Sequence, residues 1–271
     1  MLGQAKRLLE LKNLIQKEQT ENKDGKIVSF TSGKGGTGKS FLSGNIAYLL
    51  SETGKKILLI DLDLNFSNLN TLFNIHSANT IYHYLTYNKS LSDIIEKYNN
   101  NLHLILGESG KTDHPAFSNQ KAELMINELK NLSYKYDYIL VDTRSGIDEG
   151  TLKFLINSNQ VIFVVTPEPT SVMDSYVILK MLKINGADNS LKAIVNKCFT
   201  AEEGKVTFDN LDKAAKHFLK LDVEYLGELN FSEEVIKSIR NQIIFLEGQN
   251  SSEISKQIKK ISLTFQKQTF G

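Results

Sequence analysis

Short apolar runs recur along the chain, and longer stretches with a helical spacing of apolar residues separate them. Several runs are rich in Val and Ile and do not alternate with polar residues, which is typical of parallel strands buried on both faces. The pattern predicts strands at 26–31, 56–61, 102–106, 138–142, 160–166, 191–196 and 223–229. It predicts helices at 41–51, 120–132, 149–157, 171–183 and 213–221. Strands and helices that alternate in this way indicate an α/β fold with a doubly wound, mostly parallel sheet and helices on both faces.

Each end of the chain carries a further helical stripe of apolar residues. Near the N-terminus, Leu8, Leu11 and Ile15 have helical spacing, and the polar residues 19–25 that follow indicate a linker. The C-terminal stripe consists of Ile254, Ile258, Ile261 and Phe265. We therefore expect three parts, which are an N-terminal segment with its linker at 1–25, a central domain at 26–248 and a C-terminal helix at 249–271.

The C-terminal stripe lies in a segment that also carries Lys256, Lys259, Lys260 and Lys267. A basic amphipathic helix at a chain end can lie on an anionic membrane surface, in this case through residues 254–270. The alternative is a last helix that packs on the protein's own core, and the spacing of the apolar residues fits both.

Composition narrows the class of protein. Of the 271 residues, 41% are hydrophobic and 23% charged, as in ordinary soluble globular proteins. The formal net charge of +1 gives no bulk attraction for nucleic acid, so we expect no specific nucleic-acid partner. The single cysteine excludes an internal disulfide, and the histidines lack metal-ligand spacing. Without a long apolar stretch or a signal peptide, the chain is expected to be cytoplasmic.

The most specific motif is G-x-x-x-x-G-K-[ST], a phosphate-binding loop, which lies between a predicted strand and a predicted helix. Its residues and the one that follows are the candidate nucleotide contacts, namely Gly33, Lys34, Gly35, Gly36, Thr37, Gly38, Lys39, Ser40 and Phe41. The glycines let several N–H groups face one anion, and the next helix points its positive end there. Lys39 can reach the outer phosphates and the Ser40 hydroxyl can bind Mg²⁺. The alternative, a glycine-rich turn without a ligand, is disfavoured by the strand–loop–helix setting.

Polar residues follow three other predicted strands, at the ends where such sheets carry their functional groups. Asp61 and Asp63 lie one residue apart, which suits Mg²⁺ coordination and activation of an attacking water. Asp142 ends another strand, and the N–H of Gly146 beyond it could meet a γ-phosphate. Asn196 could bind the edge of adenine through its amide. Each of these residues alone could equally form a helix cap or a turn, but their order after a phosphate loop favours one site.

Lys34 between two glycines gives the loop the form K-G-G-x-G-K-[ST], and with it the chain resembles the MinD/ParA-type P-loop ATPases. Further segments resemble that family, namely 61–63 with 68–70 (D-x-D…N-L-D), 166–174 (T-P-E-P-T-S-x-x-D) and Asn196-Lys197 (N-[RK]). The resemblance implies an ATPase that binds ATP or ADP with Mg²⁺ and forms a homodimer on ATP binding.

The resemblance also implies a role for each site residue. Lys34 would reach across the dimer to the partner's nucleotide, and Lys39 would serve the phosphates of its own site. Asp63 would polarise the attacking water. Asp61, Asp142 and Ser40 would belong to the Mg²⁺ shell. Asn196 and Lys197 would contact the adenine.

Within that family, residues 3–8 resemble the D-Q-A-x-x-L-R element of the FlhG (FleN) regulators of flagellar number, with Gly3 in place of the acidic residue. The resemblance implies that residues 3–15 act on an FlhF-like, SRP-type GTPase, with flagellar switch or basal-body proteins as further candidate partners. It also implies peripheral association with the inner face of the cell membrane. The alternative for residues 3–15 is an ordinary amphipathic helix that packs on its own domain.

The chain departs from the family pattern at two places. The family's D-T-G-A-G appears as residues 142–146 with Arg144, which could pair with the γ-phosphate or point outward. The family's I-P-x-D near the base appears as residues 229–232, Leu-Asn-Phe-Ser. Two other functions therefore stay open, which are a ParA-type DNA-partition or MinD-type division-site ATPase, and a nucleotide-gated scaffold without significant hydrolysis.

Overall fold

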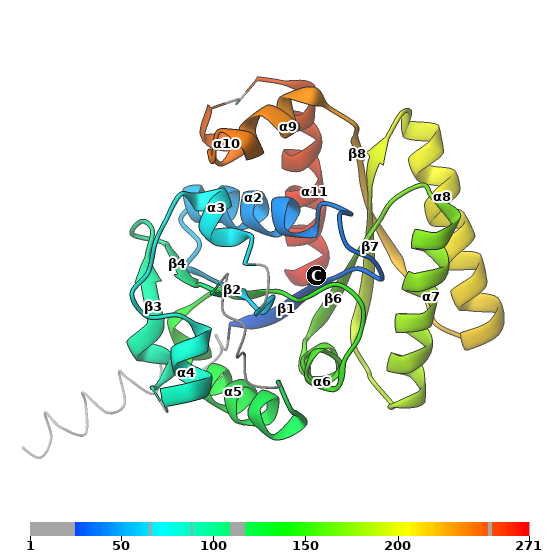
Figure 1. The fold of residues 1–271 in the computed structure, drawn as a ribbon. Coiled ribbons are helices and arrows are strands. Elements are labelled where there is room, and N and C mark those ends of the chain that lie inside the picture. Colours follow the sequence, from blue (N-terminus) through cyan, green and yellow to red (C-terminus); the bar gives the residue numbers. More distant parts are fainter. Residues whose placement is uncertain (1–24, 65–66, 88, 109–116, 249–250, 271) are drawn as a thin grey trace, which may run out of the picture.

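The sheet organises the whole molecule (Figure 1). The computed structural model describes residues 25–64, 67–87, 89–108, 117–248 and 251–270. The strands are β1 (Lys26–Thr31), β2 (Ile57–Asp61), β3 (Ile95–Lys97), β4 (Leu102–Ile105), β5 (Tyr138–Asp142), β6 (Gln160–Val165), β7 (Ser190–Cys198) and β8 (Glu224–Asn230). They form one eight-stranded sheet in the order β3-β4-β2-β5-β1-β6-β7-β8, in which only the β3–β4 pair is antiparallel. The predicted doubly wound, mostly parallel sheet is confirmed.

Helices cover both faces of this sheet. They are α2 (Lys39–Glu52), α3 (Leu69–Phe73), α4 (Ile81–Tyr87), α5 (Asn119–Leu132), α6 (Glu149–Asn157), α7 (Pro169–Ile184), α8 (Ala201–Ala214), α9 (Glu233–Arg240), α10 (Phe245–Gly248) and α11 (Glu253–Phe270). Side chains alternate along each strand, so Val28 packs with α2 and α11 whereas its neighbour Ile27 packs with α5. The helices α7 and α8 cover the same face as α5, over β6 and β7. Figure 1 shows α2 and α11 together on the opposite side from α5 and α6.

The predicted helix at 213–221 is only the last part of a longer helical segment. The helix α8 begins at Ala201, where the Thr200 side chain accepts a hydrogen bond from the Glu203 N–H. It ends at Ala214 and continues as a π-helical segment, η3 (Ala215–Leu219). The first half of its buried face carries Gly204 and Thr207, and the apolar residues that pack on the core, Phe208 and Leu211, come later in the helix. A Cβ at Gly204 would come within 2.7 Å of the Glu228 Cβ, so this helix packs too closely for a larger residue.

The C-terminal stripe belongs to the core. Ile254, Ile258, Ile261 and Phe265 are all less than 5% exposed and pack with α2 and the sheet. The Phe265 ring lies 5.3 Å from the Tyr138 ring, and Ile261 packs directly over Gly227 of β8. The prediction that residues 254–270 bind a membrane through this stripe is wrong, because the same apolar face is already buried. Among the described residues, no helix is long and apolar enough to cross a membrane.

Replacing a buried or an exposed residue of α11 tests this placement. We expect Phe265→Ala to lower the free energy of unfolding by about 3–5 kcal/mol, because it empties a filled site in the core. Leu263→Ala is the matched control on the same helix, since Leu263 is 58% exposed. It should change the same free energy by no more than about 0.5 kcal/mol. Urea unfolding measures both, and equal losses for the two variants would contradict the packing of α11.

Candidate nucleotide-binding site

The phosphate loop connects β1 to α2 at the carboxyl edge of the sheet. Gly36 and Gly38 have φ angles of 77° and 89°, a left-handed conformation that L residues rarely adopt. Gly33 is needed for another reason, because a Cβ there would lie 2.2 Å from the Cβ of Asp174. Gly38 is the N-cap residue of α2 and offers no capping side chain. The first N–H groups of α2 therefore lack a side-chain cap and are suited to bind an anion.

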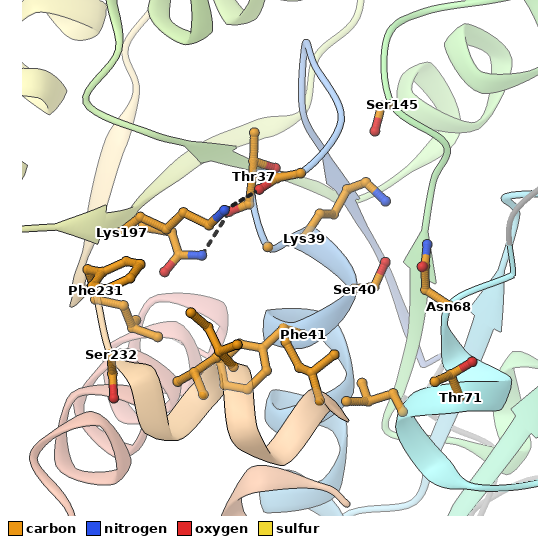
Figure 2. Close-up of a pocket in the computed structure, with 18 of the residues that line it drawn as sticks. Thr37, Lys39, Ser40, Phe41, Asn68, Thr71, Ser145, Lys197, Phe231 and Ser232 are labelled. Carbon is orange, nitrogen blue, oxygen red and sulfur yellow. Dashed lines mark hydrogen bonds between the residues drawn. The ribbon is translucent and has the colours of Figure 1, made fainter. Parts of the chain in front are cut away.

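A cavity of about 390 Å³ opens beside this loop, within the range of small-molecule sites. Figure 2 shows the loop residues Thr37, Lys39 and Ser40 above it, with Lys197 and Phe231 at one end and Asn68 and Thr71 at the other. Nine of the predicted residues line it, namely Gly36, Thr37, Gly38, Lys39, Ser40, Phe41, Asp63, Asn196 and Lys197. The structure thus brings together residues from three separate segments of the chain, which are 36–41, 63 and 196–197.

Two buried aspartates lie behind the loop. Asp61 and Asp142 end the neighbouring strands β2 and β5 and are paired in their register. The Lys39 ammonium donates to Asp142 Oδ1 at 2.8 Å, and both side chains are almost completely buried. Asp142 Oδ2 is also buried and has no hydrogen-bond partner. The phosphate-loop lysine therefore holds an aspartate of its own chain in this arrangement.

Asp61 organises the segment that follows β2. It accepts hydrogen bonds from the Asp63 N–H at 2.9 Å, the Ser67 hydroxyl at 2.8 Å and the Leu69 N–H at 3.2 Å. Burial raises the pKa of the Asp61 carboxyl, the Asp142 carboxylate raises it further, and the Asp63 N–H lowers it. Asp61 therefore positions Asp63, which lines the cavity, while the site as a whole holds an excess of buried acidic groups.

These residues fit a divalent cation. Asp142 offers an oxygen with no partner, Asp61 is its neighbour at the end of the adjoining strand, and Ser40 lines the cavity. Hard cations such as Mg²⁺ take oxygen ligands of this kind. In the part of the chain that the structure describes, no group of three His, Cys, Asp or Glu residues could hold a metal. A cation here would therefore complete its shell with phosphate oxygens and water.

Six predicted residues lie outside the cavity lining, namely Gly33, Lys34, Gly35, Asp61, Asp142 and Gly146. Lys34 faces Glu168 at the start of α7, with 3.7 Å between its Nζ and the carboxylate. The Gly146 N–H donates to the Ser32 carbonyl at 2.9 Å, and the neighbouring Ser145 lines the cavity instead. Arg144 pairs with Asp148 at 3.0 Å, so it points toward the N-terminus of α6.

The last residues of β7 contact the phosphate loop directly. Asn196 donates through Nδ2 to the Thr37 carbonyl at 2.8 Å, and Lys197 donates to the Gly36 carbonyl at 2.7 Å. Dashed lines mark both bonds in Figure 2. The Nδ2 group keeps one further hydrogen, so Asn196 can still offer a base both an acceptor, Oδ1, and a donor.

Residues 229–232 were expected near the base, but the contribution of helix α9 to the apolar end of the cavity was not predicted from the sequence. Helix α9 contributes Val235, Ile236 and Ile239, and no residue of this helix is buried. Leu229 and Phe231 at the end of β8 complete this wall. The signal was present in the sequence as apolar residues at i, i+1 and i+4 after Ser232, which caps α9. Such a wall suits a flat aromatic group.

The chain is similar to a protein-family model, to known proteins and to a solved structure. A family model described as an AAA domain matches residues 25–193. The flagellum site-determining protein YlxH of Helicobacter pylori is 33% identical over 97% of this chain and 90% of its own length. The antiactivator FleN of Pseudomonas aeruginosa is 26% identical over 87% of this chain and 84% of its own. The solved structure of the septum site-determining protein MinD from Pyrococcus horikoshii, complexed with Mg-ADP, shares the fold. Its TM-score is 0.75 at 24% identity, over 91% of this chain and 98% of that one.

Two glycine variants test how Asn196 is held against the loop. Gly38 and Gly54 have nearly equal φ angles, 89° and 83°, so Ala costs similar backbone strain at both, about 1–2 kcal/mol. Only at Gly38 would the new Cβ collide with the Asn196 side chain, 2.2 Å away, whereas nothing lies within 4 Å at Gly54. We expect Gly38→Ala to weaken ADP binding about tenfold or more, since the Asn196–Thr37 bond must break.

Gly54→Ala should leave ADP affinity unchanged, although it lowers the free energy of unfolding by an amount similar to that for Gly38→Ala. Calorimetric titration of both variants with ADP, together with their urea unfolding, measures the difference. Equal affinities for the two variants would show that the contact between Asn196 and the loop has no bearing on the site.

Proposed function

The chain belongs to the MinD/ParA-type P-loop ATPases, and on that premise we propose that it is an ATP-dependent dimerising switch that regulates flagellar number or placement. The observation that carries the switch is the position of Lys34. This lysine belongs to the phosphate loop but pairs with Glu168 outside its own cavity. A loop lysine that does not serve its own site is suited to serve the nucleotide of a second copy.

The proposed hydrolysis uses the other residues of the site in defined roles. Lys39 leaves Asp142 and binds the outer phosphates, which frees both oxygens of that aspartate. Asp142, Asp61 and Ser40 are the residues that would hold Mg²⁺, and the cation would neutralise charge on the phosphates. Asp63 lines the cavity and polarises the attacking water. The hydrogen bond from its own N–H to Asp61 fixes its position.

The base is held at the other end of the cavity. The apolar side chains of α9 and Phe231 form the surface on which a purine ring packs. The bond from Asn196 Nδ2 to the Thr37 carbonyl holds this side chain in place, and its Oδ1 accepts a hydrogen bond from the exocyclic amine of adenine.

The flagellar role rests on the relatives named above and on the N-terminal element. A flagellum site-determining protein covers nearly the whole chain, and a regulator called an antiactivator covers most of it. Residues 3–15, which we propose act on an FlhF-like GTPase, lie outside the described residues. The switch needs no membrane step through α11, because the apolar stripe of that helix is buried.

Substitutions at Asp63 and Lys34 test the switch. In Mg-ATP we expect Asp63→Ala to lower turnover about 10²–10⁴-fold, since it removes the group that activates water, and to hold the protein as a dimer. Lys34→Ala should still bind ATP but fail to dimerise, because the second site is then incomplete. Light scattering after gel filtration measures mass, and phosphate release measures turnover.

Lys183→Ala is the matched control, since Lys183 is an exposed lysine at the far end of α7. It should behave as the wild type in both assays. A wild-type protein that stays monomeric and releases no phosphate in Mg-ATP would refute the switch. Tight ATP binding without turnover would favour the nucleotide-gated scaffold.

Deleting residues 1–24 tests the flagellar assignment separately. The intact chain should raise GTP turnover of the FlhF-like GTPase, and the deleted chain should not, although its own ATP hydrolysis is unchanged. GTP hydrolysis is followed with each form at equal concentration. If the intact chain gives no stimulation while ATP turnover is normal, a division-site or DNA-partition role replaces the flagellar one, and a salt-sensitive shift of random DNA with ATP would identify the latter.

A further inference from the structure

Two consecutive residues of β7 bind two consecutive carbonyl groups of the phosphate loop. Asn196 binds the Thr37 carbonyl and Lys197 binds the Gly36 carbonyl, as Figure 2 shows. A loop that binds phosphate must turn its N–H groups toward the anion and its carbonyl groups away from it. Donors on the outer side of the loop therefore favour the same backbone shape that an anion favours from the inner side.

The backbone of β7 is distorted at the point that makes this contact. Consecutive side chains of a regular strand point to opposite faces, so Asn196 and Lys197 would not reach the same loop. Lys197 has a φ of 61°, a left-handed conformation that is unfavourable for a residue with a Cβ. The register between β7 and β8 also shifts between Val195 and Cys198. Together these two features turn neighbouring side chains toward the loop.

Strained backbone of this kind persists where the surrounding structure holds it, and it is concentrated at functional sites. Asn196 is 7% exposed, so its contact with the loop is buried, whereas the exposed Lys197 makes its contact at the surface. The Lys197 contact depends on a charged donor at the edge of the cavity. Its effect on the loop is therefore modest and measurable without unfolding the protein.

We propose that Lys197 is a positioning residue of the phosphate loop: through the Gly36 carbonyl it holds the loop in the anion-binding shape before nucleotide arrives. This proposal rests on the proposed nucleotide site, but the role that it assigns to Lys197 does not require bound nucleotide. A lysine that only touched the bound nucleotide would have no effect on the loop in its absence. The two roles therefore differ in the nucleotide-free protein.

The experiment compares three full-length variants with the wild type. Lys197→Met keeps most of the aliphatic stem and removes the donor, and Lys197→Arg restores a charged donor. Lys205→Met is the control, an exposed lysine on the adjoining helix α8. In each protein, ¹⁵N relaxation gives the order parameters of the Gly36 and Gly38 amides without nucleotide, and calorimetry gives ADP affinity.

In Lys197→Met we expect the two order parameters to fall from about 0.85, typical of rigid backbone, toward about 0.6. ADP affinity should fall about fivefold, the effect of losing one modest hydrogen bond. Lys197→Arg should recover most of both losses. Lys205→Met should match the wild type, and the thermal midpoints of all four proteins should agree within about 2 °C.

Three results would overturn the proposal. One is a Lys197→Met protein with unchanged order and affinity. Another is weaker ADP binding with unchanged order in the nucleotide-free loop, which would make Lys197 a direct nucleotide contact. The third is recovery of neither property by Lys197→Arg in a protein with a normal thermal midpoint. If the wild type binds no ADP, the proposed function fails, whereas the order parameters of the nucleotide-free proteins still test the positioning role.

Discussion

The buried ion pair between Lys39 and Asp142 is the constraint on which the site depends. It joins the first residue of α2 to the last residue of β5, and it partly balances two carboxyl groups at the same edge of the sheet. Removing one partner of a buried pair leaves an uncompensated charge and costs about 3–5 kcal/mol. Any ligand that draws Lys39 away must therefore provide a replacement cation for Asp142. A phosphate that arrives together with a divalent cation satisfies both needs at once.

The same edge of the sheet explains why residues far apart in sequence meet. The strands β1, β2, β5, β6 and β7 run in parallel, so their carboxyl ends share one edge. The phosphate loop follows β1, the aspartates end β2 and β5, and the Asn196 contact comes from β7. The side chains of the inner strands alternate between two apolar layers, which fixes the sheet rigidly beneath the loop. The relative positions of the site residues are therefore set by the sheet more than by the loops.

These features set how far the sequence could predict the structure. The inner strands were predictable because strands buried on both faces form continuous apolar runs, and the aspartates followed from strand direction. The position of α11 was not predictable, since its stripe fits a membrane or a core equally and only contacts such as Phe265 with Tyr138 decide. Only the last part of the helical segment 201–219 was predicted, because close packing at Gly204 leaves the start of α8 without an apolar residue on its buried face. The left-handed φ of Lys197 has no signature in the residue types around it.

The two lysines of the loop are held with very different strength, and this difference suits a switch. Lys39 is buried with its partner at 2.8 Å, whereas Lys34 and Glu168 are 34% and 57% exposed and 3.7 Å apart. Exposed pairs of this kind contribute about 0–1 kcal/mol, so Lys34 can leave Glu168 at little cost. Lys39 can leave Asp142 only when ligand and cation replace it. In the proposed switch, the loop thus combines one lysine that responds to its own nucleotide with another that acts on a second molecule.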